Sequence, residues 1–144
     1  HWLKQAIPAL RGDGAQLAAA RLAGPALLGA GGLTLRSAAF RAGEPLDPCF
    51  TALEEDAVAP PLDWSTPPPS AVELVLIVED PQGRSGGEPT CHWLVWGLAP
   101  QRGQLLEGEA PPCVGKNALG NGEWLPPAPG DGAAARDCVF QLFA

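Results

Sequence analysis

The chain has 144 residues, of which 18 are glycine and 17 are proline, and its formal net charge is −7. This length fits one domain with its own core, and so many helix-breaking residues exclude a mainly helical protein in favour of short strands joined by turns. The negative charge argues against a nucleic-acid-binding surface. The four cysteines are too widely spaced for a CxxC-type motif, and with only two histidines the sequence predicts no metal site and no cofactor.

Residues 1–30 are rich in alanine, leucine and glycine, and we predict that they form a helical N-terminal extension. The helical spacing is carried by Trp2, Leu3, Ala6, Ile7 and Leu10, and a further turn or two is expected over Leu17–Leu22. Residues 1–42, which include this arm, are basic, whereas residues 43–144 are acidic. The arm either packs on the acidic body or contacts anionic lipid, and the scattered charges favour packing on the body.

The uncharged run Leu22–Leu35 contains Pro25 and is too short and too interrupted to cross a membrane. The sequence therefore predicts no membrane span. The cysteines are interpreted as small buried apolar residues in a reducing compartment, although two disulfides would be compatible with export. On that basis we expect a cytoplasmic protein.

Strand-like patterns begin after residue 30. Leu33–Ser37 begins the first strand, Val72–Glu79 is apolar on both faces and predicts a central buried strand, and His92–Leu98 and Cys138–Phe143 predict two more. By simple alternation, His92 shares a face with Leu94 and Trp96. The segments between are rich in proline and glycine. Residues 31–144 are thus predicted to form a mainly β sandwich with long loops.

Six segments occur in the order expected of one known family. They are Ala59–Trp64, Leu76–Pro81, His92–Trp96, Gly115–Gly120, Trp124–Pro129 and Val139–Ala144. Together they resemble bacterial members of the phosphatidylethanolamine-binding and Raf-kinase-inhibitor-like family. The resemblance implies two antiparallel sheets with a small cavity at one end that binds phosphate-like or carboxylate groups. It also implies that the family chain continues past Phe143 into a helix and a short strand, so we expect these C-terminal elements to be missing here.

The resemblance assigns the ligand-binding residues. The family's first pocket aspartate corresponds to Asp80, its histidine before tryptophan to His92, and its glycine-rich loop to Gly115 and Asn117. A carboxylate beside an imidazole holds one tautomer and favours the protonated form, which can donate to an anion. Each residue also has an ordinary structural interpretation. Asp80 could end a strand, His92 could be a satisfied core residue, and the loop could be a simple turn.

Three pocket positions depart from the family pattern. Gln82 stands where the family has a second aspartate, and Trp124 replaces a tyrosine, which keeps the aromatic wall but changes its polar group. Arg136 falls at the second histidine, although a shift of one residue would put Ala135 there. An arginine can hold phosphate with two parallel bonds but cannot exchange protons near neutral pH. The structural alternative for Arg136 is pairing with a nearby aspartate.

The sequence therefore predicts a non-enzymatic protein that binds a small anion, such as a phospholipid headgroup, through Asp80, Gln82, His92, Gly115, Asn117, Trp124 and Arg136. The alternative is a regulatory interaction protein, modulating a kinase or protease, whose pocket is degenerate. No serine lies in a GxSxG motif and no cysteine has a histidine partner supported by a motif, so we expect no catalytic residues. The sequence identifies no protein partner.

Overall fold

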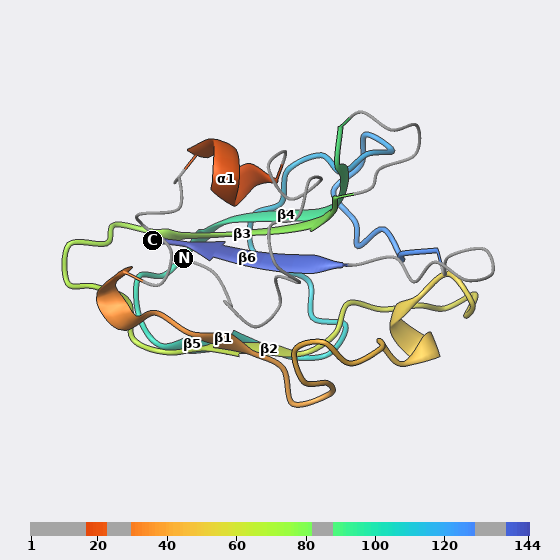
Figure 1. The fold of residues 1–144 in the computed structure, drawn as a ribbon, viewed down its shortest axis with the longest axis horizontal. Helices are drawn as coiled ribbons and strands as arrows, with labels where there is room; N and C mark the ends of the chain where they lie inside the picture. The colour runs from red at the N-terminus through yellow and green to blue at the C-terminus, as the bar shows by residue number, and fades with distance from the viewer. Residues whose placement is uncertain (1–16, 23–29, 82–87, 129–137) are drawn as a thin grey trace.

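The computed structural model describes residues 17–22, 30–81, 88–128 and 138–144. In this part of the chain two three-stranded antiparallel sheets pack face to face (Figure 1). Sheet A has the order β4-β3-β6 and sheet B the order β1-β2-β5. Sheet A consists of β3 (Leu74–Asp80), β4 (Thr90–Leu98) and β6 (Val139–Phe143), and sheet B of β1 (Leu35–Arg36), β2 (Leu62–Trp64) and β5 (Gly103–Leu105). The predicted mainly β sandwich is confirmed.

The central strand of sheet A is β3. Leu74, Leu76 and Val78 are fully buried because their side chains point between the sheets, where sheet B covers them. The strand begins at Leu74 rather than at Val72, which is 86% exposed. Apolar character alone therefore placed the strand correctly but set its start too early.

The core lies between the two sheets and takes side chains from both. It contains Leu33, Leu35, Ala59, Leu62, Trp64, Leu74, Leu76, Val78, Trp93, Val95, Leu98, Leu105, Phe140 and Leu142. The prediction of a buried strand at His92–Leu98 does not hold at Trp96, which is 48% exposed on the opposite face of β4 from Val95. A strand that faces a partner sheet on one side only can bury only alternate residues.

The face of sheet A turned away from sheet B is covered by α1 (Ala18–Leu22), as Figure 1 shows. Leu17 and Ala19 pack there against Val139 and Phe143. The predicted helical turn at residues 17–22 is therefore confirmed, and this part of the arm packs on the body. Residues 1–16 and 23–29 lie outside the described residues, and Ala30–Gly32 form a short 3₁₀ turn.

A buried polar network attaches α1 to sheet A. Glu79 Oε1 accepts a hydrogen bond of 2.8 Å from the backbone N–H of Ala18 and one of 3.0 Å from Gln141 Nε2. Gln141 Oε1 accepts one of 2.9 Å from the N–H of Ala19. These bonds satisfy N–H groups at the start of the helix, which have no acceptor within it. No helix in the described ranges is long and apolar enough to cross a membrane.

Candidate functional site

Asp80 is the last residue of β3 and lies at the end of sheet A where β4 and β6 begin. It pairs with Thr90 at the start of β4, and Glu79 beside it pairs with Val139 at the start of β6. The Asp80 side chain follows Leu76 and Val78 on the inner face and is only 4% exposed. The structure therefore places a buried carboxylate where three strands meet at one end of the sandwich.

His92 is the extra residue of a β-bulge in β4. Val78 pairs with Trp93, but the next residue of β3, Glu79, pairs with Cys91, so His92 is skipped by the ladder. A bulge redirects the side chain that it inserts. The predicted simple alternation is therefore wrong at this point: His92 and Trp93 are consecutive yet both buried.

The imidazole of His92 is oriented by a backbone carbonyl. Its Nδ1 lies 2.9 Å from the carbonyl oxygen of Leu125. A carbonyl can only accept a hydrogen bond, so Nδ1 carries a proton and the neutral form of the ring is the Nδ1–H tautomer. Leu125 also donates its own N–H to the carbonyl oxygen of His92 at 2.9 Å. Residue 125 is thus docked onto the bulge by two hydrogen bonds.

Trp124 forms the aromatic wall beside His92. Its ring centroid lies 6.4 Å from that of His92 and 5.6 Å from that of Trp93, which it meets edge-on. It also stacks on Phe140 of β6 at 6.2 Å. Its indole N–H donates to the carbonyl oxygen of Phe50 at 3.1 Å. The tryptophan therefore supplies an apolar surface at this end of the sandwich, while its polar group is used to anchor residue 50.

The glycine-rich loop runs along the outer edge of β4. The N–H of Gly115 donates to Leu94 at 2.8 Å, and the N–H of Ala118 donates to Cys91 at 2.9 Å. A Cβ added to Gly115 would overlap the end of the Leu94 side chain, which would have to move. The glycine is needed here for a close approach between the loop and the strand.

Asn117 organises the loop from within. Its side-chain nitrogen donates to Asn121 Oδ1 and to the carbonyl oxygen of Glu123, both at 2.8 Å. Its side-chain oxygen accepts from the N–H of Leu119 at 2.9 Å and from that of Asn121 at 3.3 Å. Both donors and the acceptor of the amide are used inside the loop. Asn117 therefore fixes the shape of the loop beside His92.

The structure brings together Asp80, His92 and Trp124 of the predicted site, with the loop of Gly115 and Asn117 alongside. Gln82 and Arg136 lie outside the described residues. Sequence reasoning missed two partners, the carbonyl groups of Leu125 and Phe50, because a backbone carbonyl is present at every residue and carries no sequence signal. The described residues hold no group of three or more side chains suited to a metal ion.

Comparison with known proteins gives the family. The model of the phosphatidylethanolamine-binding protein family matches residues 36–144. The chain belongs to this family. Over 113 residues it is 34% identical to LppC of Mycobacterium tuberculosis, a protein named as a candidate lipoprotein, and it spans 54% of that protein, about half its length. Over 103 residues it is 35% identical to the UPF0098 protein of Chlamydia trachomatis, covering 69% of this chain and 68% of that protein.

Two solved structures of the phosphatidylethanolamine-binding protein family share the fold. The homologue CT736 from Chlamydia trachomatis is 33% identical and superimposes with a TM-score of 0.64, covering 70% of this chain and 68% of that one. Escherichia coli YbcL has a TM-score of 0.67 at 19% identity, covering 78% of this chain and 76% of that one, a likeness of fold alone. The recognition made from the six sequence segments is confirmed.

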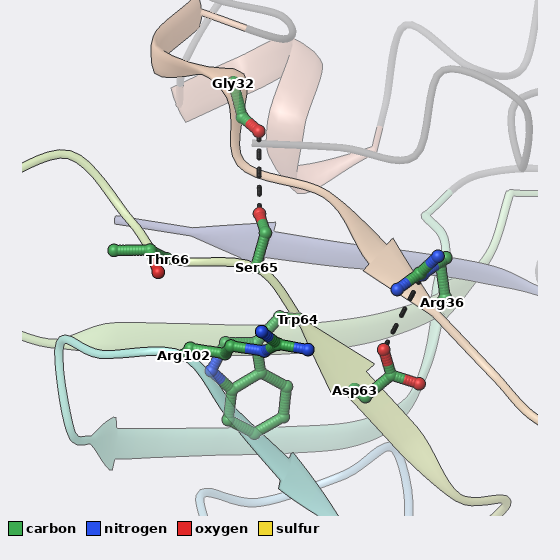
Figure 2. A pocket seen from close by; sticks show the side chains of 7 residues that line it. All are labelled: Gly32, Arg36, Asp63, Trp64, Ser65, Thr66 and Arg102. Carbon is green, nitrogen blue, oxygen red and sulfur yellow. Dashed lines mark hydrogen bonds and ion pairs between the residues drawn. The ribbon is translucent and has the colours of Figure 1, made fainter.

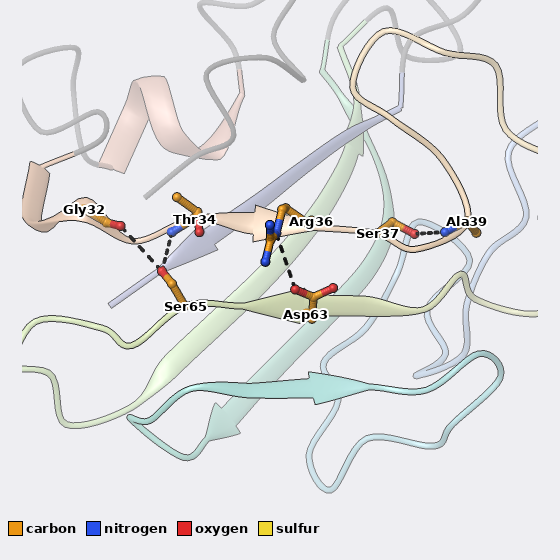
Figure 3. Close-up of polar contacts among 7 residues, drawn as sticks. All are labelled: Gly32, Thr34, Arg36, Ser37, Ala39, Asp63 and Ser65. Carbon is orange, nitrogen blue, oxygen red and sulfur yellow. Dashed lines mark hydrogen bonds and ion pairs between the residues drawn. The ribbon is translucent and has the colours of Figure 1, made fainter.

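The chain also has a pocket of about 390 Å³ at a different place, on the face of sheet B turned away from the core (Figure 2). It lies over β1 and β2, where Arg36 forms a 3.6 Å ion pair with Asp63. Figure 3 shows the polar contacts that tie these two strands together at this point. Of the predicted site residues that the structure describes, none lines this pocket.

The four cysteines of this family member all lie in the described part of the chain, and none forms a disulfide. Burial, with a contribution from the charge of Glu79, raises the pKa of the Cys91 thiol. Burial and the neighbouring carboxylate of Asp47 raise the pKa of the Cys49 thiol to about 11. Both thiols are therefore held in the protonated, unreactive form near neutral pH.

Proposed function

We propose that the chain is a non-enzymatic binding protein for a small anion, a phosphate or carboxylate group such as that of a phospholipid headgroup, at the end of sheet A. The observation that carries the proposal is the bulge at His92, which puts an oriented, buried imidazole beside Trp124 at the same end of the sheet as the buried Asp80. Membership of the phosphatidylethanolamine-binding protein family supports the ligand class.

The proposed chemistry is charge attraction in a site with little water. Protonated imidazole carries a positive charge, and a nearby carboxylate favours that form. An anion bound beside the ring is stabilised more strongly in a buried site than in water, because the effective dielectric constant is lower. Arg136, by the family correspondence, would add a second positive charge from the segment before β6. Gln82 would add a neutral hydrogen-bonding group after β3.

The test is a titration of ¹⁵N-labelled protein with O-phosphorylethanolamine and with inorganic phosphate, following the His92 ring and the amides of Asp80 and of residues 115–120 by NMR. We expect saturable shifts confined to these groups, lost in His92→Ala and retained in the matched control His1→Ala. A folded protein whose spectrum does not change at millimolar ligand would refute the proposal.

A second candidate function is that of a regulatory interaction protein, for a kinase or a protease, with a degenerate pocket. Two contacts favour it. The Trp124 N–H is bonded to Phe50, and the amide of Asn117 is fully used inside its own loop, so two of the polar groups expected at the site are already engaged. This candidate predicts that the same titration leaves the site unchanged and that a protein partner protects the loop at residues 115–123 from hydrogen exchange.

We also propose that the protein works in the cytoplasm and performs no catalysis. The absence of disulfides among its four cysteines supports a reducing compartment, whereas the name of its relative LppC points to a membrane-anchored protein. A membrane-impermeant maleimide applied to intact cells separates the two. We expect that the cysteines of a cytoplasmic protein are labelled only after lysis, whereas labelling of intact cells would contradict this location.

A further inference from the structure

The pocket on the outer face of sheet B combines two arginines with hydroxyl groups. Arg36 enters it from β1 and Arg102 from the turn before β5, and Ser65 and Thr66 line the side that follows β2. Figure 2 shows Arg36 paired with Asp63 and Arg102 beside Trp64 in the same pocket. Of the five lysines and arginines in the described ranges, two therefore converge on one pocket of a chain whose net charge is −7.

The ion pair between Arg36 and Asp63 leaves most of the arginine available. It joins Nε to Oδ1 at 3.6 Å, and the side chains are 72% and 43% exposed. A long, exposed pair of this kind contributes about 0–1 kcal/mol. It also uses only one of the five N–H groups of the guanidinium. The two terminal nitrogens of Arg36 can therefore bind a second oxyanion without breaking this contact.

Arg102 has no ion-pair partner among the residues that the structure describes, because the pair of Arg36 with Asp63 is the one found there. Two arginines and one aspartate leave the pocket with a surplus of one positive charge. Guanidinium groups bind carboxylate and phosphate groups through two parallel hydrogen bonds, which gives geometric selectivity. The local charge therefore fits a small anion.

The floor of the pocket is held rigid by contacts that do not involve the arginines. The indole N–H of Trp64 donates to Gln101 at 3.0 Å, which fixes the turn that carries Arg102. Ser65 Oγ accepts the N–H of Thr34 at 2.8 Å and donates to the carbonyl oxygen of Gly32 at 3.5 Å, which fixes the strand that carries Arg36 (Figure 3). A preformed site loses less entropy when a ligand binds.

We propose that this pocket is a second anion site, in which Arg36 and Arg102 hold the carboxylate or phosphate group of a small solute between them. Among the described residues it shares none with the site at the end of sheet A, so the outcome of its test is independent of the proposed function. The carboxylate of Asp63 repels anions and so lowers the affinity of this site for them, and it keeps the net positive charge of the pocket low.

The experiment is a titration with sodium phosphate and, separately, with sodium acetate, at constant ionic strength maintained with sodium chloride. The reporters are the indole N–H of Trp64 and the amides of Ser65 and Thr66. We expect a saturable shift of these signals, with the dissociation constant raised about fivefold or more in Arg36→Gln and in Arg102→Gln, because each removes a charge next to the ligand. The exposed Arg41, which does not line the pocket, supplies the matched control Arg41→Gln.

A variant of opposite sign makes the test sharper. Asp63→Asn removes the negative charge that faces the ligand and should tighten binding by about threefold or more. His92→Ala should leave the dissociation constant within twofold. A lower dissociation constant for phosphate than for acetate identifies the phosphate group as the ligand, and a lower one for acetate identifies the carboxylate group. The proposal is overturned if no signal saturates, if Arg41→Gln weakens binding as much as the two pocket variants, or if Asp63→Asn weakens it.

Discussion

The buried bonds between Gln141 and α1 give a prediction whose size can be worked out from the structure. Gln141 is completely buried in β6, its Nε2 donates to Glu79, and its Oε1 accepts the N–H of Ala19. Gln141→Leu keeps about the same volume but removes both bonds. A five-residue helix is not stable by itself, so α1 depends on contacts of this kind.

Two costs add in this variant. The lost hydrogen bond to the charged Glu79 carboxylate is worth about 1.5–3 kcal/mol, and the stranded N–H of Ala19 costs about 1–3 kcal/mol. Burial of a leucine side chain offsets part of this, at about 25 cal/mol per Å² of apolar surface removed from water. We expect a net loss of about 3 kcal/mol in the free energy of unfolding. An exposed substitution usually changes it by only a few tenths of a kcal/mol.

Urea denaturation followed by tryptophan fluorescence measures this loss. With an m-value of about 2 kcal/mol per molar, the midpoint should fall by about 1.5 M. The exposed Gln104 of β5 gives the matched control, because Gln104→Leu makes the same chemical change outside the network. Glu79→Gln keeps an acceptor but removes the charge, and should cost about 1 kcal/mol. If Gln141→Leu changes stability no more than Gln104→Leu, the network adds no net stability and the reasoning fails.

Three further predictions concern the site and the thiol of Cys49. Gly115→Ala should cost about 1–3 kcal/mol in thermal unfolding through its clash with Leu94, and the cost should shrink in a Leu94→Ala background; an equal cost in both would rule out this clash as the cause. Trp124→Phe should lose about 1–2 kcal/mol in urea because the carbonyl of Phe50 loses its donor, and an unchanged midpoint would contradict this. Cys49, whose pKa is raised from 9.0 to about 11, should be alkylated about a hundredfold more slowly at pH 8 in the folded protein than in urea, as followed by mass spectrometry. Because the folded state holds this proton more tightly, the free energy of unfolding should fall as pH rises from 9 towards 11. Equal alkylation rates in the folded and the unfolded protein would refute the raised pKa of Cys49.

The fold was predictable because its main elements have strong local patterns. The run from Leu74 to Val78 is apolar on both faces, which favours a central strand. The central strand β3 buries Leu74, Leu76 and Val78 on one face and half-buries Val75 and Ile77 on the other. The exposed position of Trp96 was not predictable in this way. Its side chain is as apolar as those of the core, and which face of β4 meets sheet B is decided by packing between segments far apart in the chain.

The sequence indicated three residues that the structure brings together, but not their geometry. The order of the six segments located Asp80, His92 and Trp124, and the structure brings these three to one end of sheet A. The bulge at His92 depends on a shift of pairing between two strands, which alternation within one strand cannot reveal. The role of Asn117 was likewise hidden, because its four side-chain hydrogen bonds all lie in the loop that it shapes.

The order of strands in sheet A has a consequence for synthesis of the protein. β3 pairs with β4, which follows it closely, but also with β6, where Gln141 comes 62 residues after Glu79. While the chain is being made, one edge of a strand rich in leucine, valine and isoleucine therefore stays open until β6 emerges. Open apolar edges of this kind recruit strands of other chains. The yield of folded protein should thus depend on chaperone supply and growth temperature more than on the final stability.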